Sequence, residues 1–269
     1  MIATSQRFIS YELGKGNLHK LKDVFCTTLT IHIAIAFIIV VLSEVIGVWF
    51  LNTKLNIPSD RMMAANWTLQ LSIFVFAVNV ISVPYNASIV AHEKMSAFAY
   101  ISIFEVSLKL AIAYLLLFIS YDKLIVYSIL VFCVALLLRS LYCFYCKRHF
   151  EECHYTFSFN IEQFREMFAF AGWSLVGNLG FSFKDQLSNI LLNLFFGTVV
   201  NAARGISVQV GSLINSFSAN FMMAMNPQIT KSYAVGDLYR SKELVYAGCR
   251  FSFYLLAVIS LPIMINITY

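Results

Sequence analysis

Seven long apolar runs constrain the fold of this chain more than any other feature. An α-helix needs about 20 mostly apolar residues to cross the hydrocarbon core of a bilayer, and each run is close to that length. Because lipid offers no partners to open backbone groups, we expect every run to be helical. The expected spans are Thr28–Leu51, Trp67–Val90, Ala97–Ile119, Leu124–Tyr145, Phe168–Phe196, Ala203–Met225 and Phe251–Ile267.

The amino-acid composition agrees with this assignment. Charged residues make up 12% of the chain and hydrophobic residues 59%, whereas soluble domains carry about 25% charged residues. The sequence therefore predicts an all-α fold, a polytopic transmembrane helix bundle of about seven spans.

Basic residues between the spans predict the orientation, since Lys and Arg favour cytoplasmic loops. With the N-terminus inside, three basic residues face outward: Lys54, Arg61 and Lys123. The cytoplasmic segments then hold twelve: Arg7, Lys15, Lys20, Lys22, Lys94, Lys147, Arg148, Arg165, Lys231, Arg240, Lys242 and Arg250. We expect a cytoplasmic N-terminus and an outer C-terminal end for this chain.

The longest polar stretch, Lys147–Arg165, separates four expected spans from three. It predicts two regions, 1–150 with four spans and 151–269 with three. Ile161–Phe170 has the pattern of a short amphipathic helix on the membrane surface. Further on, Gly236 and Asp237 predict a turn and a helix cap. The sequence shows no strong internal repeat.

Polar residues form a stripe on each of two neighbouring expected spans. Spacings of three and four residues place such side chains on one helical face, and polar groups at membrane depth usually face the bundle interior. Two stripes predict a shared hydrophilic cavity, and the alternative is interhelical hydrogen bonding in a dry bundle. Their members are Asn178, Ser182, Asp185, Gln186, Asn189 and Asn193, then Asn201, Arg204, Gly211, Asn215 and Ser218.

Charged residues within the spans carry the functional hypotheses. Lys184 and Arg204 could bind an anion such as phosphate. Alternatively, Lys184 pairs with an acid such as Asp185, and Arg204 extends to the interface. Glu105 and Lys109 are four residues apart and predict an intrahelical ion pair, with ion coupling as the second reading.

Two further charges are expected to reach the membrane interfaces: Arg139 the cytoplasmic one and Glu44 the outer one.

Several catalytic and binding classes are not expected. Cys143, Cys146, His149, Cys153 and His154 resemble a zinc cluster, but no second well-spaced ligand pair follows the first. We therefore expect no metal and no cofactor. No phosphate-binding loop, dinucleotide fingerprint or nucleophile elbow occurs, so neither an enzyme nor a nucleic-acid-binding protein is expected.

Three stretches together resemble a known transporter family. They are "QRFISYELGKGN" (Gln6–Asn17), "VPYNASIVAHEKMSAFAYISIFEVSLKL" (Val83–Leu110) and "ARGISVQVGSLINSFSANFMMAMNPQITKSYAVGD" (Ala203–Asp237). The chain resembles the polysaccharide flippases of the Wzx type, which serve O-antigen and capsule synthesis. They belong to the MATE/MOP exporter superfamily.

This resemblance implies a partial MATE-like fold of two lobes, with the seven spans as the third to ninth of the family. It implies that this chain alone, as an incomplete part, is inactive. The implied activity is flipping of a polyprenyl-pyrophosphate-linked oligosaccharide across the bacterial inner (plasma) membrane by alternating access. O-antigen, capsule or exopolysaccharide export would depend on it.

The resemblance also implies roles for the polar residues. Arg204 and Lys184 would attract the pyrophosphate, while Asp185 or Glu105 could sense a driving ion. The implied partners are the lipid-linked oligosaccharide, membrane lipids and polysaccharide polymerase machinery. The expected sugar contacts are Asn178, Asn189, Asn193 and Asn215.

Three rival functions remain open. A MATE-like cation-coupled multidrug exporter would need acidic groups in the cavity, whereas Lys184 and Arg204 against Asp185 are net basic. A membrane-embedded glycosyltransferase or polymerase would show a large external loop with catalytic groups, and every expected outer loop is short. A non-catalytic scaffold for polymer assembly is the third rival.

Overall fold

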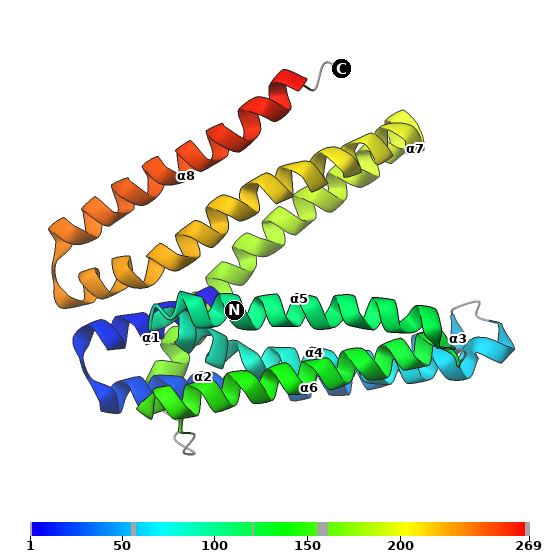
Figure 1. Cartoon of the computed structure of the whole chain (residues 1–269), viewed down its shortest axis with the longest axis horizontal. Helices are drawn as coiled ribbons and strands as arrows, with labels where there is room; N and C mark the ends of the chain where they lie inside the picture. The colour runs from blue at the N-terminus through cyan, green and yellow to red at the C-terminus, as the bar shows by residue number, and fades with distance from the viewer. Residues whose placement is uncertain (1, 55–57, 120, 155–160, 267–269) are drawn as a thin grey trace. The chain divides into compact units, whose positions relative to one another are not determined.

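The computed structural model describes residues 2–54, 58–119, 121–154 and 161–266 (Figure 1). These residues form helices joined by short turns and include no β-strand, which confirms the all-α prediction. The long helices are α1 (Ile2–Lys15), α2 (Leu18–Leu42), α4 (Met62–Ala91), α5 (Met95–Phe118), α6 (Lys123–His149), α7 (Ile161–Val235) and α8 (Leu238–Asn266). The short ones are η1 (Ser43–Gly47), α3 (Val48–Thr53), η2 (Ser59–Arg61) and η3 (Glu151–Cys153).

Five helical segments among the described residues are long and apolar enough to cross a membrane. They are Leu18–Thr53, Met62–Ala91, Met95–Phe118, Lys123–His149 and Leu238–Ile265. They match five of the expected spans and show a membrane protein. The expected spans Phe168–Phe196 and Ala203–Met225 both lie within α7, which is helical but is not one of the five.

The chain divides into two compact units. The first comprises residues 1–9 and 17–164, and the second residues 10–16 and 165–269. The segment Ile161–Phe170, expected as a separate surface helix, is the first part of the longer α7. The proposed division of the lobes at residue 150 stays a prediction.

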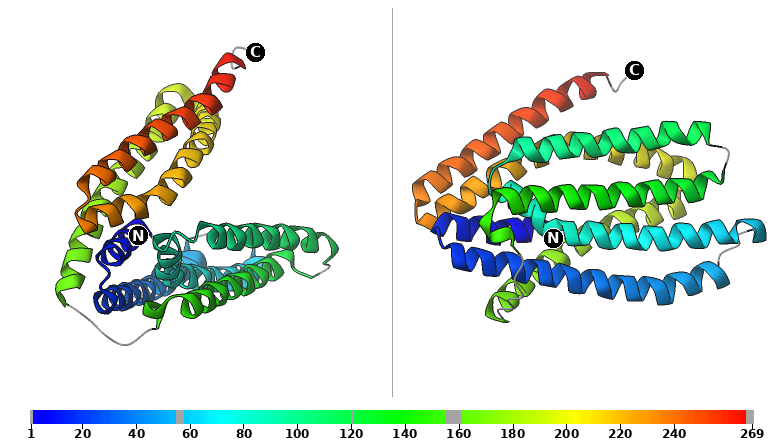
Figure 2. Two further views of the ribbon diagram at one scale, coloured as in Figure 1. Left: turned by 60° about the vertical axis from the view of Figure 1, so that its left-hand side comes forward. Right: turned by 60° about the horizontal axis from the view of Figure 1, so that its bottom comes forward.

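In the first unit, α2, α4, α5 and α6 run alongside one another (Figures 1 and 2). Helix α4 is central because it packs against α2, α5 and α6. Half of its most apolar part is buried, whereas the most apolar parts of Leu18–Thr53 and of α5 are almost wholly exposed. The many large apolar side chains left exposed on the outer helices suit contact with lipid.

An arginine of α6 lies against α4 beside its internal proline. Pro84 has no amide hydrogen, so it interrupts the hydrogen-bond ladder of α4. Arg139 of α6 donates from Nη1 to the carbonyl oxygen of Ile81, and its guanidinium lies 4.6 Å from the ring centre of Tyr85. Arg139 was expected to extend to the interface, but its guanidinium instead bonds to a carbonyl of the neighbouring helix.

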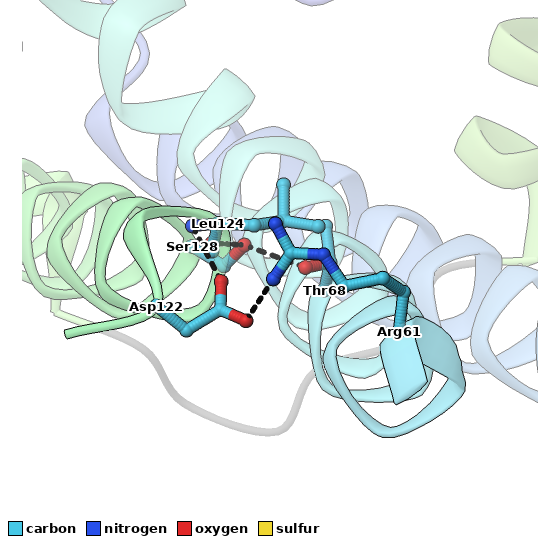
Figure 3. A network of polar contacts seen from close by, with 5 residues as sticks. All are labelled: Arg61, Thr68, Asp122, Leu124 and Ser128. Atoms are coloured by element: carbon cyan, nitrogen blue, oxygen red, sulfur yellow. Dashed lines mark hydrogen bonds and ion pairs between the residues drawn. The ribbon is translucent and has the colours of Figure 1, made fainter. Parts of the chain in front are cut away.

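Polar contacts hold α4 and α6 together at their expected outer ends (Figure 3). Arg61 Nη1 lies 2.5 Å from Asp122 Oδ2. The other oxygen of Asp122 accepts from the amide of Leu124 at 3.0 Å and so caps α6. One turn further in, Ser128 Oγ donates to Thr68 Oγ1 at 3.1 Å. An aspartate therefore serves both as helix cap and as ion-pair partner.

In the second unit, α7 folds back on itself. A straight helix rises about 1.5 Å per residue, which would separate residues 185 and 204 by about 28 Å. Yet Arg204 Nη2 lies 3.8 Å from Asp185 Oδ1. The ribbon accordingly reverses direction where its colour becomes yellow, near residue 200 (Figure 1).

Helix α8 runs antiparallel to the last part of α7. Ser241 Oγ donates to the carbonyl of Ile229 at 3.4 Å, and a Cβ on Gly248 would lie 3.1 Å from Met222 Sδ. The hairpin turn is Gly236, whose φ of +88° suits glycine. Asp237 Oδ1 accepts from the amide of Arg240 at 2.9 Å. The predicted turn and cap are therefore confirmed.

The same turn occurs twice in the chain. The segment "GNLHKLKDV" starts at Gly16 and "GDLYRSKEL" starts at Gly236, 220 residues later. Gly16 has a φ of +70°, and Asn17 Oδ1 accepts from the amide of Lys20 at 3.1 Å, as Asp237 does from Arg240. The amides of both glycines donate to a carbonyl three residues earlier, each at 3.1 Å.

This local repeat relates α1, its turn and α2 to the end of α7, its turn and α8. Between the two turns the chain passes through α2, α4, α5 and α6 and then both arms of α7, so α8 repeats α2 after six helical passes. Sequence reasoning overlooked the repeat because only Gly, Leu and Lys are identical among its nine residues.

Candidate functional site

The charged residues expected to bind an anion meet in the second unit. Asp185 Oδ1 lies 3.8 Å from Lys184 Nζ and 3.8 Å from Arg204 Nη2. Lys184 and Asp185 come from the first arm of α7, and Arg204 comes from the returning arm. The reversal of α7 therefore brings a second cation, Arg204, to a carboxylate that already has Lys184 beside it in the sequence.

This cluster has a net charge of +1 and is held loosely. Both N–O distances exceed that of a hydrogen bond. The side chain of Arg204 is 22% exposed, against 53% for Asp185 and 66% for Lys184. Ion pairs exposed to this extent contribute little to stability, so the cluster is better suited to exchanging partners than to holding the arms together.

The asparagines of the polar stripes lie along both arms of α7. Asn178 and Asn215 are exposed, and each donates to a carbonyl four residues earlier, that of Ser174 or Gly211, at 2.9 Å. Each keeps its side-chain oxygen directed away from that bond. Asn189 is half-buried. The side chains of Asn193 and Asn201 lie outside the described residues.

A hollow on the surface of the second unit lies elsewhere. It has a volume of about 440 Å³ and is open to the surface. Its lining comes from one face of α8: Arg240, Glu243, Leu244 and Ala247. None of the predicted site residues lies there.

The second candidate for ion coupling, Glu105, lies in the first unit. Lys109 Nζ donates to Glu105 Oε1 at 2.6 Å, so the predicted intrahelical ion pair is confirmed. A carboxylate already bonded to a cation on its own helix is less available to a driving ion than one without such a partner.

The cysteine and histidine cluster near the end of α6 has other partners. Cys146 Sγ donates to the carbonyl of Tyr85 at 3.5 Å, and Cys153 is fully buried in η3. Hydrogen bonding with Cys146 and burial raise the pKa of the Cys153 thiol well above its usual range. A neutral, buried thiol is a poor metal ligand, so this environment does not favour metal binding.

A histidine and a glutamate anchor the segment after α6. His92 Nε2 lies 2.5 Å from Glu152 Oε1, and the His92 ring stacks on Phe150 at 3.9 Å between centres. The Glu152 side chain is only 3% exposed. This contact joins the end of α4 to η3. No local pattern could predict it, because the two residues are 60 positions apart.

A second polar pair was also missed. Gln70 Nε2 donates to Glu44 Oε2 at 2.7 Å, and both side chains are partly buried. Glu44 was expected to reach the outer interface, but it turns toward α4. The sequence hints at this pair only by placing a glutamate in one apolar run and a glutamine in the next.

Comparisons with protein-family models, curated proteins and solved structures found no match to this chain. The apolar helices are compatible with a membrane transporter.

Proposed function

We propose that this chain is part of a flippase for lipid-linked oligosaccharides. Its substrate would be a polyprenyl-pyrophosphate carrying a sugar unit, moved from the cytoplasmic to the outer leaflet of a bacterial inner membrane. The exported unit would serve O-antigen, capsule or exopolysaccharide synthesis. The proposal builds on the resemblance to Wzx-type flippases of the MATE/MOP superfamily.

The observation that carries the proposal is the cation pair around Asp185. A pyrophosphate is a multivalent anion that Arg binds through several N–H donors and Lys as a point charge. Arg204 and Lys184 lie 3.8 Å from the same carboxylate oxygen, so an arriving diphosphate could replace Asp185 as their partner. Asparagines on the same arms offer amides suited to sugar hydroxyls.

The repeated turn supports a transporter over a static scaffold. Secondary transporters are often built from structural repeats, including parallel repeats of six spans, which move against each other around a central site. Here α8 repeats α2 after six helical passes, and both copies begin at a glycine turn followed by an Asx cap. That spacing supports alternating access between two related lobes.

The charge of the cluster favours a pyrophosphate-linked substrate over the organic cations of a multidrug exporter. A MATE-like multidrug exporter takes organic cations, which require acidic groups. The cluster has two cations and one carboxylate, which favours an anion. This preference depends only on the charges of the cluster and not on the orientation of the chain in the membrane or on the division into lobes.

Deleting the gene that encodes this chain tests the proposal. The lipids of the deletion strain are extracted, and polyprenyl-pyrophosphate oligosaccharides are measured by mass spectrometry. We expect complete lipid-linked units to accumulate and surface polymer to be lost, with recovery on complementation. Unchanged lipid intermediates and normal surface polymer would exclude the flippase, and drug susceptibility would then test the exporter.

A further inference from the structure

The surface hollow on α8 is large enough to hold a small ligand. Its volume of about 440 Å³ falls within the range of about 300–1,000 Å³ that is typical of sites for small molecules. Its lining combines two charged and two apolar side chains: Arg240, Glu243, Leu244 and Ala247. The proposed flippase activity uses none of these four residues.

Two opposite charges line the hollow without pairing. Arg240 and Glu243 are three residues apart, so they lie on the same face of α8, and both side chains are exposed. Within the described part of the chain, neither charged group has an ion pair. The bond between Arg240 and Asp237 uses the backbone amide of Arg240, not its guanidinium. The hollow therefore presents a cation and an anion side by side.

The apolar part of the lining lies one helical turn further along. Leu244 follows Arg240 by four residues, and Ala247 follows Glu243 by four, so each apolar side chain lies beyond a charged one on the same face. Both apolar residues are half-buried. A ligand that fits this lining has a charged end and an apolar end.

The charged part of the hollow lies at the level of lipid headgroups. The segment Leu238–Ile265 has 28 residues and is apolar enough to cross a membrane, so at about 1.5 Å per residue it is about 42 Å long. A bilayer with its headgroup layers is about 40–45 Å thick, so both ends of this segment lie among headgroups. Arg240 is its third residue, whereas Ala247 lies about 10 Å further toward the hydrocarbon core.

We propose that this hollow binds a zwitterionic phospholipid whose headgroup carries a phosphate and a primary ammonium, as in phosphatidylethanolamine. Arg240 donates N–H groups to the phosphate oxygens, and the ammonium donates to the carboxylate of Glu243. Leu244 and Ala247 contact the beginning of an acyl chain. Since the two side chains sum to zero charge, they suit a headgroup without net charge better than an anionic one, which Glu243 repels.

Native mass spectrometry of the full chain, released from detergent, tests this preference. The chain is offered phosphatidylethanolamine, phosphatidylcholine or phosphatidylglycerol with identical acyl chains, and the lipid retained per chain is counted. Phosphatidylethanolamine should be retained several-fold more than either of the others. The choline headgroup has no N–H donor for Glu243, and the glycerol headgroup has no cation.

Three variants locate the preference on α8. Arg240→Gln should lower the retention of phosphatidylethanolamine, whereas Glu243→Gln should lower it without weakening that of phosphatidylglycerol. Lys242→Gln is the matched control, because two residues correspond to about 200° around the helix, so this lysine points away from the hollow. The control should keep the wild-type preference.

Equal retention of the three lipids by the wild-type chain would overturn the proposal, and a protein segment would then be the better occupant of the hollow. A preference that survives Glu243→Gln would also overturn it, and this variant decides the matter if Arg240→Gln fails to fold. Loss of the preference in Lys242→Gln would assign it to general surface charge. None of these readouts involves transport, so they stand or fall separately from the proposed flippase activity.

Discussion

Gly14 of α1 packs closely against Ala234 near the end of α7. A Cβ placed on Gly14 would lie 2.9 Å from Ala234 Cβ, 2.9 Å from Lys231 Cα and 2.9 Å from the Lys231 carbonyl oxygen. The two residues are 220 positions apart, the same offset that relates the glycine turns that follow them. Equivalent positions of the repeat therefore meet.

This contact predicts that Gly14 tolerates no side chain. Helix propensity alone favours Gly14→Ala by about 1 kcal/mol, but overpacking typically costs about 1–3 kcal/mol. The opposing atoms are two backbone atoms and a Cβ, none of which can rotate away. We expect net destabilisation, measured as a lower midpoint of thermal unfolding in detergent. Gly47→Ala is the control, because its Cβ would lie 3.8 Å from Leu69, an ordinary contact. Equal or higher stability of Gly14→Ala would contradict the close approach.

The paired caps make a second prediction. Replacing an Asn or Asp N-cap by Ala costs about 1 kcal/mol, and Asn17 and Asp237 cap α2 and α8 with the same geometry. Asn17→Ala and Asp237→Ala should each raise hydrogen exchange about fivefold at the amides of Lys20 and Arg240 respectively. The exchanged caps Asn17→Asp and Asp237→Asn should leave exchange nearly unchanged. Protection retained in either Ala variant would show that the cap bond does not stabilise that helix.

The charge cluster predicts opposite effects for its members. Asp185→Asn removes the carboxylate that competes for Arg204 and Lys184, so inorganic pyrophosphate should bind several-fold more tightly. Arg204→Ala should weaken binding by roughly tenfold, the effect of about 1.4 kcal/mol. Both can be measured by isothermal titration calorimetry at fixed ionic strength, since exposed charges are screened by salt.

Lys242→Ala on α8 is the control for this series, because that lysine lies outside the cluster. It should leave the affinity for pyrophosphate unchanged. Weaker binding in Asp185→Asn would mean that the carboxylate supports the site rather than competing for it.

Burial of Cys153 predicts slow thiol chemistry. Its pKa lies above the reference value of 9.0, so the reactive thiolate is scarce at pH 8. Iodoacetamide should modify exposed Cys249, which lies just before the expected span Phe251–Ile267, well before Cys153, as peptide mass spectrometry can follow. Because the folded pKa is raised, the stabilisation from the neutral thiol is complete below pH 9 and is lost as the pH rises further. Rapid labelling of Cys153 in the folded chain would contradict its burial.

Features that depend on nearby residues could be predicted from the sequence. The apolar runs indicated the spans because crossing a bilayer requires a fixed length of apolar helix. The Gly236–Asp237 turn and the Glu105–Lys109 pair followed from local chemistry, since their partners are at most four residues apart.

Features that depend on distant residues could not be predicted in this way. Arg139 was expected at the interface because its acceptor, the Ile81 carbonyl, lies 58 residues away. The bond between Glu44 and Gln70 requires the π-helical turn of Ser43–Gly47, for which no sequence rule was available. The charge cluster was foreseen only as residues on two stripes, and the 3.8 Å contacts depend on how α7 reverses.

The sidedness of the lipid-linked oligosaccharide tests the proposed flippase most directly. Inverted and right-side-out membrane vesicles from the deletion strain and its complemented parent would be treated with a membrane-impermeant reagent that oxidises sugars, followed by mass spectrometry of the lipids. We predict that the accumulated units of the deletion strain are modified only in inverted vesicles, where the cytoplasmic leaflet faces the reagent. Modification to the same extent in right-side-out vesicles of both strains would show that the units cross without this protein and would contradict the account.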